Sequence, residues 1–139
     1  MPTSTRAAAA GLGAIGALHV VWATGSPWPM GDRRLLTDAA VGSDGDQPPP
    51  PAACLAVAAL LAAAAALVDG RPRALPGLSR LGAGGVVAVL ATRGALGLAG
   101  RTDALSPGSV SERFRRLDRR VYSPLCLSLA ALAAPAMRR

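Results

Sequence analysis

Few side chains in this sequence have the chemistry to bind anions or to move protons, and several of them lie in or beside long apolar runs. The residues singled out on this basis are His19, Arg93, Asp118 and Tyr122. An imidazole, a carboxylate or a phenol at such a position can act in proton transfer, whereas a guanidinium there needs an anionic partner. The sequence contains no serine-histidine-aspartate pattern, no metal-ligand spacing and no glycine-rich phosphate loop, and its two cysteines are not a C-x-x-C redox pair.

Arg93 interrupts the apolar run between Arg80 and Arg101. The pieces on either side of it, residues 81–92 and 94–100, are well short of the roughly 20 residues that a membrane span needs, so Arg93 must lie inside a helix. On insertion scales an arginine at the centre of a helix costs about 2.5 to 3.5 kcal/mol, and less near an end. The side chain then either extends to the surface about 10 Å away, counting about 1.5 Å per residue, or turns into the bundle and pairs there.

Asp118 is the partner that we expect for Arg93. A desolvated guanidinium is costly unless an acceptor satisfies its donors, and Asp118 is expected on an ordered helix near membrane depth, at the end of the bundle where Arg93 lies. The alternatives for Arg93 are His19, Tyr122 or the anionic group of a ligand. The alternative for Asp118 is a surface ion pair with Arg115, three residues earlier.

The composition favours a membrane protein over a soluble one. Apolar residues make up 51% of the 139 residues, only 3% are aromatic, and the mean hydropathy is +0.36, which is too apolar and too poor in large side chains for an ordinary soluble core. The net charge is +7, and all fifteen basic residues are arginines that lie mostly between the apolar runs. This spacing without interleaved aromatic residues favours phosphate contacts at a membrane surface and disfavours a nucleic-acid groove.

Four apolar runs predict an all-α protein, a four-helix transmembrane bundle that forms a single membrane domain over residues 1–139. The expected spans are residues 7–25, 52–68, 81–100 and 122–137. The first run also has the layout of a secretory signal peptide, but its length and Trp22 next to the small-residue motif disfavour cleavage. The long segment between the first two spans is acidic and proline-rich in its second half, and we expect a solvated connector there without a calcium loop.

A short amphipathic helix is expected before the fourth span, at about residues 110–121. Its apolar side chains fall on one narrow stripe at about 100° per residue and its arginines cover the rest, which is typical of a helix in the headgroup layer. Ser109 and Glu112 predict a capping box at its start. Ser123 and Pro124 predict the start of the next helix, so the chain is expected to turn a corner at Tyr122 and Ser123.

Antiparallel alternation of four spans brings the candidate residues towards one end of the bundle. The predicted polar cluster consists of His19, Trp22, Trp28, Arg93, Asp118, Tyr122 and Cys126. The two tryptophans are most simply interfacial anchors, and a single histidine near a helix end is more often a structural hydrogen-bonding group than a base. Cys54 and Cys126 are expected at similar depth. A disulfide between them would need Cα atoms within about 7 Å, and two buried, inert thiols are the favoured outcome.

Several short motifs carry a resemblance to a known family. The motifs are His19-x-x-Trp22-Ala23 with Gly25 and Trp28-Pro29, then Arg93-Gly94, then Phe114-x-x-Leu117-Asp118-x-x-x-Tyr122-Ser123-Pro124-Leu125-Cys126. Together they resemble a family of small four-helix bacterial integral membrane proteins classed as a domain of unknown function. The resemblance covers most of the chain and implies the four-span fold and the importance of these positions, but no activity. In that family an acidic residue often follows the glycines near the membrane arginine, where this chain has Leu98, so the departure disfavours a local acidic partner for Arg93 and points to Asp118.

Three function classes follow from these observations. The favoured class is a membrane protein that binds a lipid headgroup, another anion or a partner protein at one polar end of the bundle. The alternatives are a small membrane enzyme that uses His19, Asp118 or Tyr122 in proton transfer, and a structural subunit of a membrane complex. We expect a multi-pass protein of the cell membrane whose partners are the lipid bilayer and an anionic lipid or membrane protein. No nucleic acid, cofactor or metal is expected, and the arginine distribution does not decide the membrane orientation.

Overall fold

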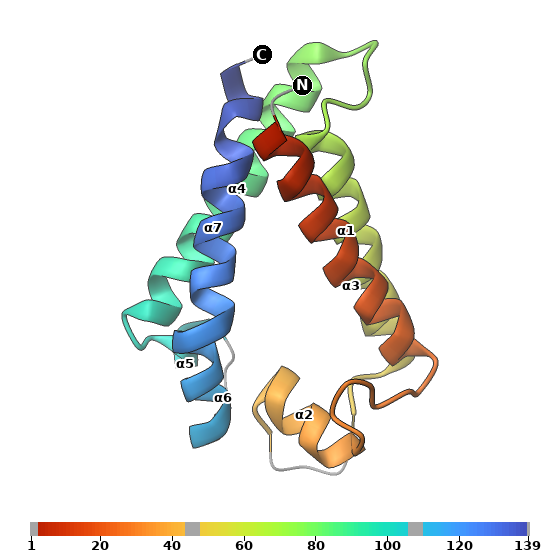
Figure 1. Ribbon diagram of the computed structural model, residues 1–139, viewed down its shortest axis with the longest axis vertical. Coiled ribbons are helices and arrows are strands. Elements are labelled where there is room, and N and C mark those ends of the chain that lie inside the picture. Colours follow the sequence, from red (N-terminus) through yellow and green to blue (C-terminus); the bar gives the residue numbers. More distant parts are fainter. Residues whose placement is uncertain (1–2, 44–47, 106–109, 139) are drawn as a thin grey trace.

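The computed structural model describes residues 3–43, 48–105 and 110–138, and every regular element in these ranges is helical (Figure 1). The long helices are α1 (Thr3–Ala23), α3 (Pro51–Val68) and α4 (Pro76–Leu98). A fourth long helical segment, Glu112–Arg138, is continuous but changes its winding along its length. All four are long and apolar enough to cross a membrane. The predicted all-α fold with four spans is therefore confirmed.

The four long helices pack as two pairs. α1 lies along α3, and α4 lies along the C-terminal part of the fourth helix, α7 (Ser123–Ala133) (Figure 1). The pairs approach each other at the end that holds both termini and diverge towards the opposite end. The buried core lies where they meet, and it combines alanine with larger aliphatic side chains: Ala8, Leu12, Val68, Leu129 and Ala133.

The fourth helix begins with α6 (Glu112–Leu117), widens into the π-helical turn η1 (Asp118–Tyr122), continues as α7 and ends in the 3₁₀ turn η2 (Ala134–Arg138). The expected corner at Tyr122 and Ser123 is wrong, because both residues have helical dihedral angles and Ser123 N–H bonds to the carbonyl oxygen of Asp118. The wide turn lies directly before Pro124, which has no N–H to donate to an α-helical bond.

The start of this helix also differs from the expected capping box. Ser111 is its N-cap, and the Ser111 Oγ accepts from the N–H of Phe114 at 3.1 Å. Ser109, the cap expected from the sequence, lies outside the described residues. α6 and α7 form one column (Figure 1), and the placement of α6 in the headgroup layer stays a prediction.

The connector between α1 and α3 contains a helix that the sequence interpretation missed, α2 (Arg33–Val41). Asp32 caps its N-terminus, where the Asp32 Oδ1 accepts from the N–H of Arg34 at 2.6 Å and of Leu35 at 3.4 Å. Gly42 ends it with φ +79°, a left-handed conformation that glycine adopts without steric cost. α2 lies at the open end of the two diverging helix pairs (Figure 1).

A further short helix, α5 (Thr102–Leu105), follows α4 at the same end of the bundle (Figure 1).

Candidate functional site

Asp118 is the centre of a buried polar cluster. Its side chain is completely buried, and its Oδ1 accepts from the Arg93 Nη2 at 2.7 Å and from the Ser123 Oγ at 3.1 Å. Its Oδ2 accepts from the Thr102 Oγ1 at 2.8 Å. Arg115 instead pairs with Glu112 at 3.5 Å. The predicted pairing of Arg93 with Asp118 is confirmed, and the surface pair of Asp118 with Arg115 is not formed.

The π-helical turn positions Ser123 against this carboxylate, and α5 positions Thr102 against it. The i to i−5 backbone bond from Ser123 to Asp118 goes with a direct bond between their side chains, so the turn satisfies the carboxylate from within its own helix. Thr102 reaches Asp118 from the first residue of α5, and its side chain is buried. The sequence interpretation missed both roles. The available signal for Thr102 was a hydroxyl residue shortly after the glycine that ends α4.

Gly97 gives this cluster its space. A Cβ atom at Gly97 would lie 2.9 Å from both the Arg93 Nη1 and the Asp118 Oδ2, and it would overlap the Ser123 Oγ. No larger residue fits there unless the cluster moves. α4 therefore supplies both the charged group and the gap that lets the fourth helix approach it.

A second set of contacts fastens α2 to the fourth helix. Tyr122 donates its hydroxyl to the carbonyl oxygen of Ala39 at 2.7 Å, and its ring packs on Phe114 with centroids 5.9 Å apart. Arg113 lies 3.9 Å from the Asp38 carboxylate. Tyr122 therefore bonds across the open end of the bundle to α2 and not to Arg93.

His19 and the two tryptophans form a separate group on α1 and the loop after it. His19 Nδ1 lies 2.8 Å from the carbonyl oxygen of Ile15, and its ring centroid is 4.8 Å from that of Trp22. Trp22 donates its Nε1–H to the carbonyl oxygen of Trp28 at 2.8 Å. Within the described residues, none of these side chains bonds to Arg93 or Asp118. The predicted residues therefore lie in three separate sets of contacts, those of the ion pair, of Tyr122 and of His19 with the tryptophans. The anchor role of the tryptophans stays a prediction.

The two cysteines are free thiols. Cys54 is buried near the start of α3, and Cys126 is partly buried in α7. The alternative of a disulfide between them is not formed; the burial expected of both thiols holds for Cys54, whereas Cys126 is only partly buried. Among the described residues, no three histidine, cysteine, aspartate or glutamate side chains come together as a set of metal ligands.

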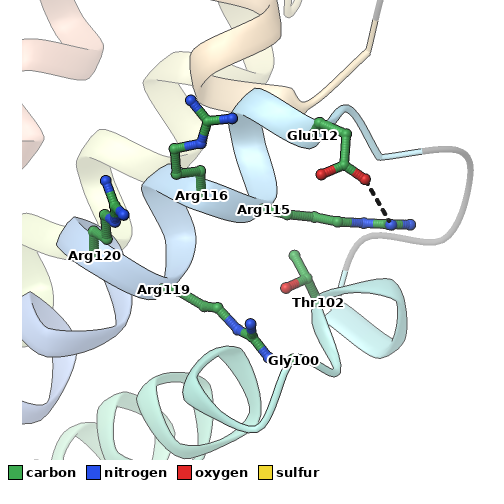
Figure 2. Close-up of a pocket in the computed structure, with 7 residues that line it drawn as sticks. All are labelled: Gly100, Thr102, Glu112, Arg115, Arg116, Arg119 and Arg120. Carbon is green, nitrogen blue, oxygen red and sulfur yellow. Dashed lines mark ion pairs between the residues drawn. The ribbon is translucent and has the colours of Figure 1, made fainter.

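An open pocket of about 620 Å³ lies beside the Asp118 cluster, and we call it the arginine pocket (Figure 2). It is lined by Gly100, Thr102, Glu112, Arg115, Arg116, Arg119 and Arg120. Figure 2 shows Arg119 reaching Gly100 and Arg115 lying beside Glu112. Gly100 has φ +75°, a left-handed conformation that glycine adopts without steric cost, and a Cβ atom there would be 2.7 Å from the Nη2 at the end of the flexible Arg119 side chain. Sequence reasoning identified these arginines as headgroup contacts but not as the lining of a pocket.

A family model described as "Protein of unknown function (DUF3995)" matches residues 12–133. The chain belongs to this family. The match includes the greater part of each of the four long helices. It supports the predicted resemblance to a family of unknown function, while the individual motifs and a bacterial origin stay predictions. Comparisons with curated proteins and with solved structures gave no match. Family membership brings no activity, so the function has to be inferred from the arrangement of the side chains.

Proposed function

We propose that this multi-pass membrane protein binds a phosphate-bearing anion in the arginine pocket, at the polar end of the bundle in the cell membrane. The shared chemistry is a phosphate group, whether it belongs to a lipid headgroup or to a soluble phosphate compound. The observation that carries the proposal is the charge of the pocket wall, which has four arginines and one glutamate.

The arginines are mostly uncompensated. Glu112 is occupied by Arg115 at 3.5 Å, and none of the other three pocket arginines has an acidic partner within 4 Å among the described residues. Guanidinium groups bind phosphate through paired N–H donors, and such charge-assisted bonds are among the strongest available in proteins. All four arginines are exposed and can be reached from outside. The volume lies within the roughly 300 to 1,000 Å³ of typical ligand sites.

The buried cluster supports this role as a scaffold. Thr102 lines the arginine pocket and also bonds to Asp118, and Arg119 follows Asp118 directly in the π-helical turn. The pocket wall is thereby attached to a fully buried ion-paired carboxylate. A wall held in this way is preorganised, which reduces the ordering cost of binding an anion.

The other function classes have less support. For proton transfer, the Asp118 carboxylate is fully buried and already accepts three hydrogen bonds, and Tyr122 and His19 bond to backbone carbonyl groups elsewhere. None of these contacts favours the alternative of a membrane enzyme that transfers protons. The structural-subunit class and a protein partner at this end stay predictions.

The test compares phosphate compounds that carry a net negative charge with a phospholipid whose net charge is zero. We would measure, by isothermal titration calorimetry on the protein in detergent, the binding of short-chain phosphatidic acid, of inorganic pyrophosphate and of short-chain phosphatidylcholine. We expect an anionic ligand to bind and phosphatidylcholine to bind far more weakly. Binding of phosphatidic acid alone would identify a lipid headgroup, and binding of pyrophosphate as well would identify the free phosphate group.

A matched pair of variants locates the site. Arg116→Gln with Arg119→Gln removes two pocket arginines, whereas Arg80→Gln with Arg138→Gln removes two exposed arginines at the opposite end. Each lost charge-assisted bond contributes about 1.5 to 3 kcal/mol, so the first variant should bind at least about tenfold more weakly. The control should bind like the parent. Equal losses in both variants, or no anion binding by the parent, would overturn the proposal.

A further inference from the structure

A long apolar groove lies between α3 and α4, well away from the arginine pocket. It has a volume of about 510 Å³, and its walls include Leu12, Val57, Leu60, Leu67, Gly85 and Val89. Leu60 and Val89 are 70% and 69% exposed, so the groove opens on the outer surface of the helices. A Cβ atom at Gly85 would meet nothing within 4 Å, so this glycine leaves an unfilled gap in the wall.

The groove has the length of one membrane leaflet. It follows α3 from Val57 to Leu67, and ten residues of helix at about 1.5 Å each extend over about 15 Å. This is half of the roughly 30 Å hydrocarbon core of a bilayer. The groove starts near the middle of α3 and runs to the C-terminal end of that helix, which lies at the end of the bundle that holds both termini (Figure 1).

The surface end of the groove is positively charged. A second, shallower hollow shares Ala63 and Leu67 with the groove and is bounded by Arg71, Pro72 and Arg73. Arg71 lies 3.3 Å from the Asp69 carboxylate, whereas Arg73 has no acidic partner within 4 Å among the described residues. An apolar groove about one leaflet long that ends at an uncompensated guanidinium is complementary to two parts of an anionic phospholipid. The groove matches one acyl chain, and the guanidinium matches the phosphate group.

We propose that the groove between α3 and α4 binds one acyl chain of an anionic phospholipid of the leaflet at the terminal end, with its phosphate at Arg73. A transmembrane helix from a second copy would extend across the whole hydrocarbon core, whereas the groove extends over half of it. The positive charge of Arg73 at the end of the groove is matched by the negative charge of a phosphate. This site is independent of the arginine pocket, which lies at the opposite end of the bundle (Figure 1).

The first experiment is lipid photocrosslinking. The protein is reconstituted into vesicles of phosphatidylcholine with a minor fraction of phosphatidylglycerol whose acyl chain carries a diazirine, and after irradiation the adducts are mapped by mass spectrometry of peptides. We expect adducts to concentrate on α3 and α4 at the groove. Adducts spread evenly over all exposed helix faces, or adducts that concentrate on helix faces other than the groove, would overturn the proposal.

The second experiment fills the groove. Gly85→Leu places a large side chain in the open gap without a clash and with a better helix former, so the variant is expected to fold. Gly13→Leu is the matched control, because Gly13 lies on α1 outside the groove and its Cβ would also meet nothing within 4 Å. Gly85→Leu should lower the adducts at the groove several-fold, and Gly13→Leu should leave them unchanged. Adducts that persist in Gly85→Leu would refute the binding of a chain there.

The third comparison tests the phosphate contact. Arg73→Gln should reduce the preference of the groove for phosphatidylglycerol over a diazirine-labelled phosphatidylcholine towards equality. Arg80→Gln, an exposed arginine at the same end that lines neither hollow, should preserve the preference. If Arg73→Gln leaves the preference of the parent intact, or if the parent shows none, the assignment of the phosphate to Arg73 is wrong.

Discussion

The hydroxyl of Thr102 donates to the Oδ2 of Asp118 at 2.8 Å, and the same threonine lines the arginine pocket. One residue therefore joins an open, positively charged surface to a buried, neutralised ion pair. Movement of the pocket wall on anion binding would act directly on the hydrogen bonds of Asp118. Arg119, which follows Asp118 directly in the π-helical turn, is a second connection between the pocket wall and the ion pair.

Removing the Asp118 carboxylate should destabilise the protein strongly. Asp118→Ala leaves Arg93, whose side chain is 27% exposed, without its counter-charge, and the about 3 to 5 kcal/mol lost when one partner of a fully buried pair is removed is the upper range of the expected cost. Thermal unfolding in detergent measures the effect. Asp69→Ala removes a carboxylate from the more exposed pair with Arg71 and should cost only about 0 to 1 kcal/mol. An Asp118→Ala variant as stable as the parent would show that the pair contributes no net stability.

A methyl group at Gly97 should disrupt the same cluster by overpacking. Gly97→Ala places the Cβ atom 2.9 Å from both the Arg93 Nη1 and the Asp118 Oδ2, so side chains or backbone must shift, at a cost of about 1 to 3 kcal/mol. Gly85→Ala, on the same helix but in open space, should be neutral or slightly stabilising. The unfolding temperatures of the two variants give the comparison. Equal temperatures would mean that the cluster adjusts without cost.

The bond from Tyr122 to Ala39 should hold α2 in place. Tyr122→Phe keeps the ring but removes the hydroxyl, and one such hydrogen bond contributes about 0.5 to 1.5 kcal/mol. Amide hydrogen exchange of α2 should become faster, with little change in α3 or α4. Thr24→Val removes a bond of 2.7 Å to Val21 that does not involve α2, and it should leave the exchange of α2 unchanged. If exchange in α2 is the same in Tyr122→Phe and the parent, the tether is not this hydroxyl.

The spans and the central ion pair could be predicted from the sequence because both follow from large energies. An apolar run of membrane length has few alternatives to a helix in a bilayer, and an arginine that splits such a run into two short pieces must find a partner. Arg93 and Asp118 are 25 residues apart, yet the cost of an unpaired buried charge was enough to connect them. His19 contacts Ile15 and not the ion pair, because end-to-end alternation predicts the depth of a residue in the bundle but not the side on which it lies, and its membership of the functional site stays a prediction.

The elements that were missed depend on smaller, local preferences. α2 rests on the Asp32 cap, the Gly42 terminus and a buried apolar face, and the polar composition of the connector concealed these signals. The π-helical turn replaced an expected corner because proline after serine is compatible both with the start of a new helix and with a locally widened one. The sequence pattern alone does not decide between a corner and a widened turn. The widened turn is accompanied by hydrogen bonds to Asp118 from Thr102, which precedes the turn, and from Ser123, which follows it.

The separation of Arg93 and Asp118 along the chain has a consequence for biosynthesis. During translation α4 emerges before Asp118, so Arg93 leaves the ribosome before its partner Asp118 has been synthesised. On insertion scales this arginine adds up to about 2.5 to 3.5 kcal/mol to the cost of transferring α4 into lipid, and only the fourth helix relieves it. We therefore expect α4 to stay at the lateral gate of the insertion machinery until the following residues arrive. The second half of the protein would then enter the bilayer as a helical hairpin.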